Sequence, residues 1–205
     1  HAQAQQVFVK KAFEALCNNK LIEANPWLST QLVLSTHSNH VVNELDLNYM
    51  RYFKRVVDVG GKIPVSKVVN LSNTFGTDDE TKQFVTRYIR LTHCDIFFSE
   101  AVILVEGPAE KILVPSFLEK AGLDSYYISV IEVNGRHAHS FRKLIGKIGI
   151  ATLIVTDIDA TETKVGEDGK ERHLPVITAK GKGYKTGNPS IKSWLLGKEQ
   201  IDDLL

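Results

Sequence analysis

The chain has 205 residues, of which 43% are hydrophobic and 24% charged, so it can bury one good core, or one core with a smaller satellite. No apolar run approaches the roughly 18 residues that span a bilayer, and the first residues are neither a signal nor a transit peptide, so we expect a soluble, cytoplasmic protein. Cys17 and Cys94 lie far apart and in no metal-ligand spacing, which argues against a disulfide framework and a zinc site. A net charge of +1 is not that of a passive nucleic-acid binder, so any DNA contact must come from a local patch or from metal ions.

The first half of the chain predicts a helix at each end and short strands between them. Apolar residues that recur at a spacing of three and four open the chain and indicate a helix: Val7, Phe8, Ala12, Phe13 and Leu16. Runs rich in β-forming residues follow at 31–36, 52–59 and 65–71, and Asp78 then begins an amphipathic helix. The sequence starts without an initiator methionine and directly on a helical pattern, so we expect a fragment of a longer protein.

From residue 101 the pattern changes to short apolar strands that alternate with helices. The units, in chain order, are strand Ala101–Val105, helix Pro108–Ala121, strand Tyr127–Val133, helix His139–Ile148 and strand Ala151–Thr156. This alternation predicts an α/β fold with a parallel sheet and helices on both faces. Ligands of such sheets bind at the carboxyl ends of the strands. Residues 178–189 are rich in Lys and Gly and predict a surface loop.

Two acidic pairs follow the first and third of these strands. Glu106 and Glu110 come after the first, and Asp157 and Asp159 after the third, so the fold is expected to bring them together. Gly107 lets the backbone turn after the strand, and in an extended segment residues two apart point the same way. Four converging carboxylates repel one another unless divalent cations lie between them, and hard oxygen ligands select Mg²⁺ or Mn²⁺.

Each acidic pair taken alone has a simpler explanation. A glutamate near a helix N-terminus is usually only a favourable partner of the helix dipole, and an Asp-x-Asp after a strand is usually a turn. Their joint placement is what favours a metal site: an apolar strand ending in Glu-Gly, then helix, strand, helix, and an apolar strand ending in Asp-x-Asp.

The segments Leu104–Lys111 and Leu153–Asp159 resemble the Toprim domain shared by topoisomerases, bacterial primases, recombination mediators and OLD nucleases. The Glu-Gly-x-x-Glu form, its continuation at 112–115 and the turn Val133-Asn134-Gly135 are most similar to the OLD (overcoming lysogenization defect) family. The resemblance implies a Rossmann-like Toprim fold and a site for two Mg²⁺ or Mn²⁺ ions. The metal-binding residues that it implies are Glu106, Glu110, Asp157 and Asp159.

The first half carries a second resemblance. The segment Leu32–Ser38 is similar to the strand and switch histidine of an ABC-type ATPase, which would make His37 a sensor of the ATP γ-phosphate. His1-Ala2-Gln3 resembles the sequence after the Walker B acidic residues of such ATPases. By itself, His37 is more simply a polar residue at a strand end. OLD proteins join this ATPase type to a Toprim domain in the same order, which favours the ATPase interpretation.

The two resemblances together imply a division of the chain. Residues 1–75 would be the C-terminal portion of an ABC-type ATPase domain, 76–99 a helical connector and 100–205 a Toprim nuclease domain. No Gly-x-x-x-x-Gly-Lys-Ser/Thr loop occurs, so the fragment is not expected to hydrolyse ATP by itself. ATP would serve the full-length protein, which the ATPase type predicts to act as a homodimer.

Several weaker candidates surround the acidic pairs. Thr156 and Thr161 are candidate auxiliary metal ligands, and Arg136 and His137 follow a turn from which they can touch a phosphate. A basic patch for DNA is predicted in the Lys-Gly segment, in which Lys182 is also a candidate for neutralising charge in the transition state: Lys180, Lys182, Lys185 and Lys192. A solvated, flexible loop explains these residues equally well.

The function predicted from these features is that of a Mg²⁺-dependent DNA endonuclease with two metal ions, as part of an OLD-family enzyme. Two alternatives stay open. One is an RNase of the Toprim class, and the other is a Toprim module that binds DNA or partners without cutting.

Overall fold

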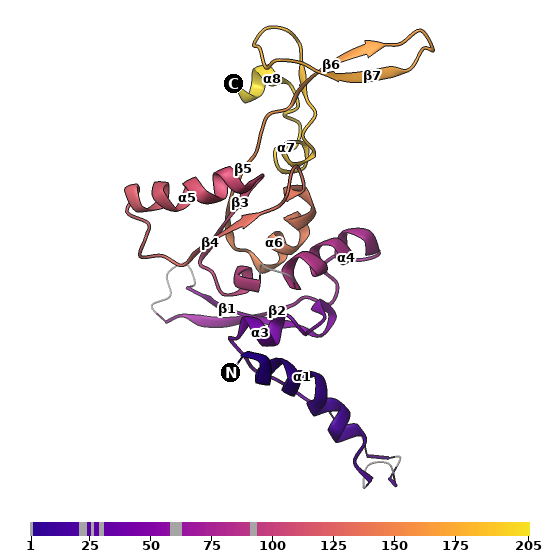
Figure 1. Cartoon of the computed structure of the whole chain (residues 1–205), viewed down its shortest axis with the longest axis vertical. Coiled ribbons are helices and arrows are strands. Elements are labelled where there is room, and N and C mark those ends of the chain that lie inside the picture. Colours follow the sequence, from indigo (N-terminus) through magenta and orange to yellow (C-terminus); the bar gives the residue numbers. More distant parts are fainter. Residues whose placement is uncertain (1, 21–23, 26, 29–30, 58–62, 91–93) are drawn as a thin grey trace. The chain divides into compact units, whose positions relative to one another are not determined.

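The computed structural model describes residues 2–20, 24–25, 27–28, 31–57, 63–90 and 94–205. The chain forms two compact units, His1–Phe98 and Ser99–Leu205, whose helices and strands are labelled in Figure 1. None of the described helices is long and apolar enough to cross a lipid bilayer. The predicted boundary between an ATPase part and a connector, both at or before residue 99, stays a prediction.

The first unit consists of short helices and one β-hairpin. Its elements are α1 (Ala2–Cys17), α3 (Asn39–Val42), the 3-10 helix η1 (Leu47–Tyr49), β1 (Arg51–Val56), β2 (Val65–Asn70), α4 (Asp79–Tyr88) and the 3-10 helix η3 (Cys94–Phe97). β1 and β2 pair antiparallel over their full length. Asp78 caps α4, because its carboxylate accepts a hydrogen bond from Thr81 N at 3.1 Å. The two predicted helices and the strands at β1 and β2 are confirmed, although residues 58–59 of the first strand's predicted range lie outside the described residues.

The run at 31–36, predicted as a strand, has no regular secondary structure, so that prediction was wrong. A β-strand is stable when a neighbouring strand completes its backbone hydrogen bonds. Among the residues that the structure describes, no strand pairs with this run. Side chains hold its end instead: Thr36 Oγ1 accepts from Ser38 N (3.0 Å), and Ser38 Oγ donates to Gln5 Oε1 of α1 (2.7 Å).

The second unit contains the predicted parallel sheet. Its elements are β3 (Ala101–Val105), α5 (Pro108–Lys120), β4 (Ile128–Glu132), the 3-10 helix η4 (Ala138–Phe141), α6 (Arg142–Ile148) and β5 (Ala151–Val155). The strand order is β4-β3-β5, and both pairings are parallel. The chain crosses from β3 to β4 and then back past β3 to β5, and α5 and α6 lie on opposite faces of the sheet, as Figure 1 shows. The α/β fold with helices on both faces is therefore confirmed.

Burial of both faces explains why the central strand β3 is wholly apolar. On the α5 face, Ile103 and Val105 of β3 form a cluster with Val114 of α5. Strand alternation points Val102 and Leu104 to the other face, where both are fully buried. A strand that is buried on both faces has no solvent side, so apolar residues fill consecutive positions.

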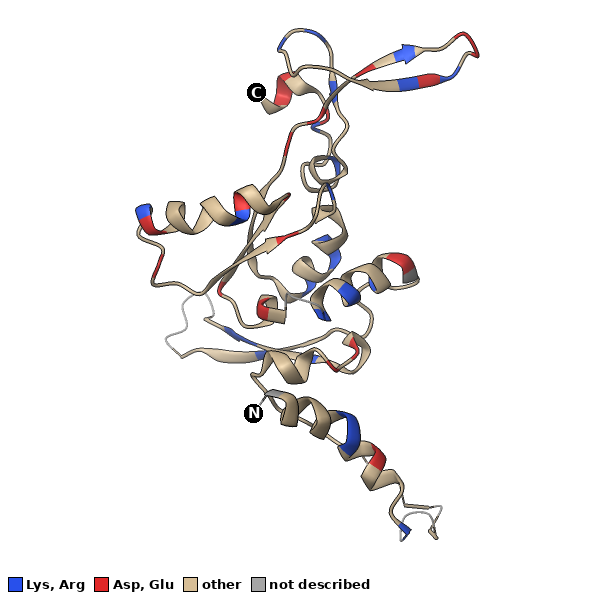
Figure 2. Ribbon diagram, viewed as in Figure 1, with Lys and Arg blue, Asp and Glu red and all other residues tan. Residues whose placement is uncertain are grey.

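A second, antiparallel sheet follows the parallel one. Its elements and the helices after it are β6 (Ala160–Val165), β7 (Glu171–Pro175), β8 (Lys185–Thr186), α7 (Pro189–Trp194) and α8 (Ile201–Leu204), with strand order β7-β6-β8. The β6–β7 hairpin, which carries residues of both charge signs (Figure 2), was not predicted, and the predicted loop at 178–189 contains the short strand β8. β8 exists because its two residues pair with Ala160 and Thr161 at the start of β6, which no local pattern could indicate.

Candidate metal centre

The carboxyl ends of the three parallel strands meet at one edge of the sheet. Val105 is the last residue of β3 and lies opposite Glu132 of β4 and Val155 of β5. The segments that leave the strands therefore start side by side. Gly135 N, in the turn after β4, donates to Glu106 O at 2.8 Å, which joins two of these segments directly.

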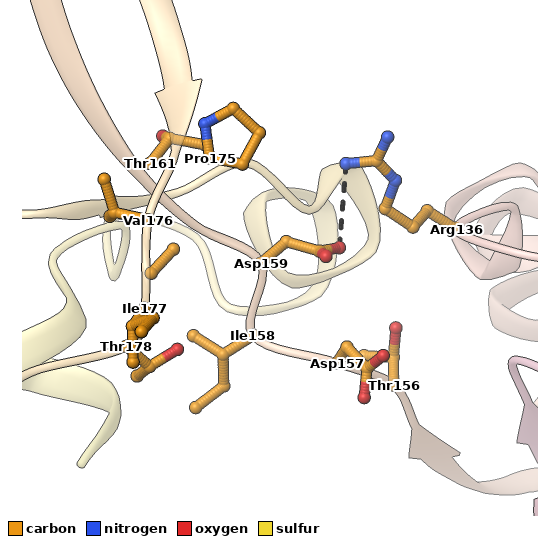
Figure 3. Close-up of a pocket in the computed structure, with 11 residues that line it drawn as sticks. Arg136, Thr156, Asp157, Ile158, Asp159, Thr161, Pro175, Val176, Ile177 and Thr178 are labelled. Carbon is orange, nitrogen blue, oxygen red and sulfur yellow. Dashed lines mark ion pairs between the residues drawn. The ribbon is translucent and has the colours of Figure 1, made fainter.

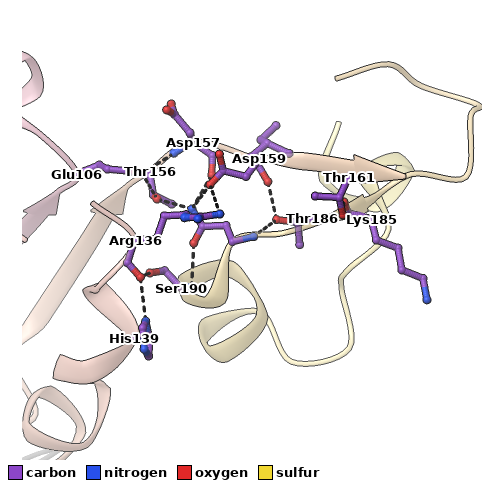
Figure 4. A network of polar contacts seen from close by, with 12 residues as sticks. Glu106, Arg136, His139, Thr156, Asp157, Asp159, Thr161, Lys185, Thr186 and Ser190 are labelled. Carbon is purple, nitrogen blue, oxygen red and sulfur yellow. Dashed lines mark hydrogen bonds and ion pairs between the residues drawn. The ribbon is translucent and has the colours of Figure 1, made fainter. Parts of the chain in front are cut away.

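Glu106 is fixed by the end of β5. Its Oε2 accepts a hydrogen bond from Thr156 Oγ1 at 2.6 Å and another from Asp157 N at 3.1 Å (Figure 4). The register places Thr156 beside Glu106, because each follows directly on a residue of the pair Val105–Val155. One carboxylate oxygen of Glu106 thus bridges the ends of β3 and β5.

Glu110 lies in the first turn of α5, where a negative charge is favoured. Its Oε2 accepts from Gly107 N at 3.0 Å. Gly107 has φ −143°, an extended value open to any residue, so the turn itself does not require glycine. A Cβ at this position would lie 3.3 Å from the Glu110 oxygen, a tight contact with the end of a flexible side chain.

Asp157 is the acidic residue of this edge whose carboxyl is affected by the other three acidic groups. It is solvent-exposed, and within the described part of the chain its carboxylate has no hydrogen-bond donor. Partial desolvation raises the pKa of the Asp157 carboxyl above its ordinary value, and the negative charges of Glu106, Asp159 and Glu110 raise it further. The four carboxylates are therefore near enough to repel one another.

Asp159 departs from the extended backbone that was predicted for this loop. Its φ is +50°, in the left-handed region, so the rule that residues two apart point the same way does not apply to Asp157 and Asp159. Asp159 Oδ2 lies 3.6 Å from Arg136 Nη1 and 3.2 Å from Asn188 Nδ2. Figure 3 shows the Asp159 side chain turned toward Arg136.

A pocket of about 600 Å³ opens beside the acidic loop (Figure 3). Its walls come from residues 156–161, from residues 175–178 and from Arg136. The charged part of the lining is Asp157, Asp159 and the guanidinium, three threonines add hydroxyls, and Ile158 and Val176 contribute an apolar part. Neither Glu106 nor Glu110 lines this pocket, so it extends from the aspartates and away from the glutamates.

The chemistry of the donors fits a hard divalent cation. All four candidate ligands are carboxylates, and among the described residues Arg136 is the one cation within ion-pair distance of any of them. As the side chains stand, no group of three or more acidic, His or Cys residues in the described part of the chain is close enough to hold one ion. The ligand set Glu106, Glu110, Asp157 and Asp159 therefore stays a prediction.

The other predicted site residues lie in several places. Thr161 is in the pocket, but its hydroxyl donates to Lys185 O at 3.0 Å. Lys180, Lys182 and Lys185 are exposed and form no ion pair with a described residue, and Figure 4 shows the Lys185 side chain pointing away from the acidic residues. His37 belongs to the first unit, where it is exposed.

Three buried polar residues beside the acidic loop were not predicted. Thr186 and Asn188 are completely buried and Ser190 is almost so. Asn188 Nδ2 lies 2.8 Å from Thr156 Oγ1 and 2.9 Å from Asp157 O. One signal was available in the sequence, since Asn188-Pro189-Ser190 is typical of a helix start, with Asn as cap and Pro at the first helical position. It predicts a cap, and it does not predict the contacts with the acidic loop.

Comparisons with known proteins agree with these features. Residues 97–159 match the family model "Overcoming lysogenization defect protein-like, TOPRIM domain", a segment that includes all four acidic residues. The chain is 28% identical over 214 residues to "Endonuclease GajA" of Bacillus cereus (strain HuB5-5), a match that covers 100% of this chain and 30% of that protein. It is 24% identical over 202 residues to "Endonuclease GajA" of Bacillus cereus (strain VD045), covering 97% of this chain and 30% of that protein.

The family model covers only part of this chain, and this chain covers only part of its relatives. The chain spans about 30% of the length of the curated relatives it matches. The family match ends at Asp159, the last of the four predicted ligands, and it begins just before β3. The parallel sheet and its acidic edge in residues 97–159 are a TOPRIM domain of the OLD-like family, as the motifs at Glu106 and Asp157 predicted.

Proposed function

We propose that this chain supplies the nuclease site of an OLD-family endonuclease and cleaves phosphodiester bonds of DNA with the help of divalent metal ions. The observation that carries this proposal is the Asp157 carboxylate, which lacks a donor among the described residues and has a pKa raised partly by three neighbouring acidic groups. Such repulsion is costly in the free protein and becomes an advantage when cations bind. The endonuclease names of the relatives support the same activity.

The proposed ligands of two Mg²⁺ or Mn²⁺ ions are Glu106, Glu110, Asp157 and Asp159, with Thr161 as an auxiliary ligand. When bound, the ions supply the activation of water and the stabilisation of the departing 3′ oxygen. Glu106 contributes rigidity, since its Oε2 is already held by the hydroxyl of Thr156 and the amide of Asp157. Asp157 is the ligand most suited to serve both ions, because it lies among the other three.

The proposed DNA contacts come from cations near this loop. Arg136 lines the pocket together with both aspartates, so its guanidinium can bind a phosphate that enters there. Lys180, Lys182 and Lys185 extend the proposed DNA surface, and Lys182 is the candidate for neutralising charge on the scissile phosphate. Their ammonium groups have no acidic partner in the described part of the chain, which leaves them available for phosphates.

In the first unit, His37 is proposed to sense the γ-phosphate of ATP in the full-length protein. That protein is proposed to be a homodimer. The present sequence has no phosphate-binding Walker A loop, so ATP turnover is not expected from this chain alone.

Nicking of supercoiled plasmid by the whole chain tests the proposal. We expect nicked circles with Mg²⁺ or Mn²⁺, none with EDTA, and none from Asp157→Asn with either ion. Asp124→Asn is a matched control, since Asp124 is an exposed aspartate in the turn after α5. Cleavage of RNA but not of DNA would favour a Toprim-class RNase. DNA binding without cleavage, under conditions in which the metal binds, would favour a non-catalytic module.

A further inference from the structure

The acidic loop is held by a segment that lies beyond the family match. Thr186, Gly187 and Asn188, together called the tether, each donate a hydrogen bond to a different backbone carbonyl of the loop. These bonds are Thr186 Oγ1 to Ile158 O (2.5 Å), Gly187 N to Asp159 O (2.7 Å) and Asn188 Nδ2 to Asp157 O (2.9 Å). Three consecutive carbonyls of the loop are thus satisfied by three consecutive residues of the tether.

The Asn188 amide is oriented by the helix that it caps. Its Oδ1 accepts from Ser190 N at 2.8 Å, at the start of α7, so its Nδ2 must face the acidic loop. Thr156 Oγ1 gives its proton to Glu106 and accepts from Asn188, which uses both capacities of that hydroxyl. Through Thr156, Asn188 is linked to the carboxylate of Glu106, and its Nδ2 lies directly at 3.2 Å from Asp159 Oδ2.

Burial makes these contacts hard to replace. Thr186 and Asn188 are fully buried, so their own polar groups depend on these hydrogen bonds in place of water. Gly187 permits the close approach, because a Cβ there would lie 2.9 Å from Thr161 Cγ2 and 3.2 Å from Asp159 O. The tether also stabilises the left-handed backbone of Asp159, a conformation that aspartate adopts only at some cost in free energy.

We propose that the tether is a positioning element that sets the arrangement of Asp157, Asp159 and Glu106, with the N–H donors of Asn188 as its main contribution. The proposal deepens the proposed function and rests on it for the effect on catalysis. The tether residues are not proposed to contact the substrate. Asn188 is a positioning residue that acts through Thr156 and through the backbone of the loop.

Two substitutions of Asn188 separate hydrogen-bond donation from space filling. Serine and aspartate both cap helices well, so Asn188→Ser and Asn188→Asp preserve the start of α7. Serine is too short to reach the loop but adds no charge, whereas aspartate keeps the size of asparagine, lacks its N–H donors and adds a negative charge. Loss of the donors is therefore the one change that both variants share. Ser129→Ala is the control, because it removes a buried hydroxyl at the opposite end of the parallel sheet, where Ser129 bonds Ser99.

Both Asn188 variants are expected to lose about ten- to a hundredfold in kcat for plasmid nicking, as when an outer-shell partner of a metal site is removed. The KM for the plasmid should stay unchanged, and the Mn²⁺ concentration for half-maximal activity should rise. Hydrogen exchange gives a readout that is independent of activity. The Asp157 amide, which donates to Glu106, should exchange faster in both variants and at the wild-type rate in Ser129→Ala.

The possible results distinguish a failure of the positioning role of Asn188 from a failure of the proposed nuclease function. An Asn188→Asp chain that keeps the wild-type kcat and Asp157 exchange rate would show that size alone matters and would overturn the inference. Equal changes in Ser129→Ala would overturn it too, as general destabilisation. If the wild-type chain neither nicks DNA nor binds Mn²⁺, the proposed function fails, and the exchange rate of the Asp157 amide still decides whether Asn188 holds the loop.

Discussion

The two ends of the parallel sheet bury polar side chains with different consequences. At the amino end, the hydroxyls of Ser99 and Ser129 bond to each other, both within the buried interior. At the carboxyl end, the hydroxyl of Thr156 links Asn188 to the carboxylate of Glu106. A hydrogen bond between two buried hydroxyls contributes only to the stability of the fold. A series of hydrogen bonds that ends on a half-buried carboxylate also fixes the position of a charged group. The same kind of hydrogen bond is thus structural at one end of the sheet and positional at the other.

The largest expected effect is that of Asp157→Ala at the carboxyl end. Nicking should fall on the order of a hundredfold or more, because a shared ligand is lost from both proposed metal sites. The melting temperature of the metal-free protein should stay the same or rise, since one of four repelling carboxylates is removed. Initial nicking rates and metal-free melting, measured on one preparation, check both parts. Lost activity with a clearly lower melting temperature would mean that Asp157 is structural.

A smaller effect is expected from Thr156→Val, which keeps the shape of the side chain and removes its hydroxyl. Glu106 and Asn188 both lose a partner, so nicking should fall about tenfold or more. Thr152→Val is the matched control on the same strand, because the Thr152 hydroxyl donates to Ile150 O at the amino end of β5. Similar nicking rates for the two variants would contradict a positional role for the carboxyl end.

At the amino end, Ser129→Ala should change stability and leave nicking unchanged. The Ser99 hydroxyl loses its bond to Ser129 within the interior, at a cost of about 1 kcal/mol. For a chain of this size that corresponds to a fall of about 2–4 °C in Tm. Thermal melting of the metal-free protein measures the fall, and a reduced nicking rate at a temperature well below Tm would break the comparison between the two ends.

The smallest expected effect is a pH dependence at the carboxyl end. Because the pKa of Asp157 is raised in the folded protein, its protonated form favours folding, and that contribution is lost as the pH rises through the folded-state pKa. Asp157→Asn removes the titration, so its advantage in metal-free Tm over the wild type should be larger at pH 7 than at pH 4. Melting curves at both pH values check the sign, and an advantage that grows on acidification would refute it.

Much of the second unit could be predicted from local pattern. The strands around Ile103 and Leu153 are short and apolar, and Pro108 marks a helix start, so the alternation of strands and helices follows from the order of residues alone. Because parallel strands end at one edge, the approach of Glu106 to Asp157 also follows once the alternation is recognised.

Pairing between strands that are distant along the chain could not be predicted from the sequence. The run at 31–36 has the composition of a strand and is not one, because no described strand pairs with it. β8 has only two residues and is a strand solely through its pairing with β6. A strand is defined by its neighbour, so residue types alone could neither exclude the first nor find the second.

The sequence by itself determined which side chains carry the charge of the candidate site and at which strand ends they lie. Tertiary structure alone decided the directions in which these side chains point. Asp159 has a left-handed backbone, which the alternation of side chains along an extended segment does not predict. Asn188, 31 residues after Asp157 along the chain, supplies hydrogen-bond donors to the loop that carries both aspartates. The physical reason is that charge belongs to each residue, whereas the direction of a side chain depends on hydrogen bonds made by residues that folding brings together.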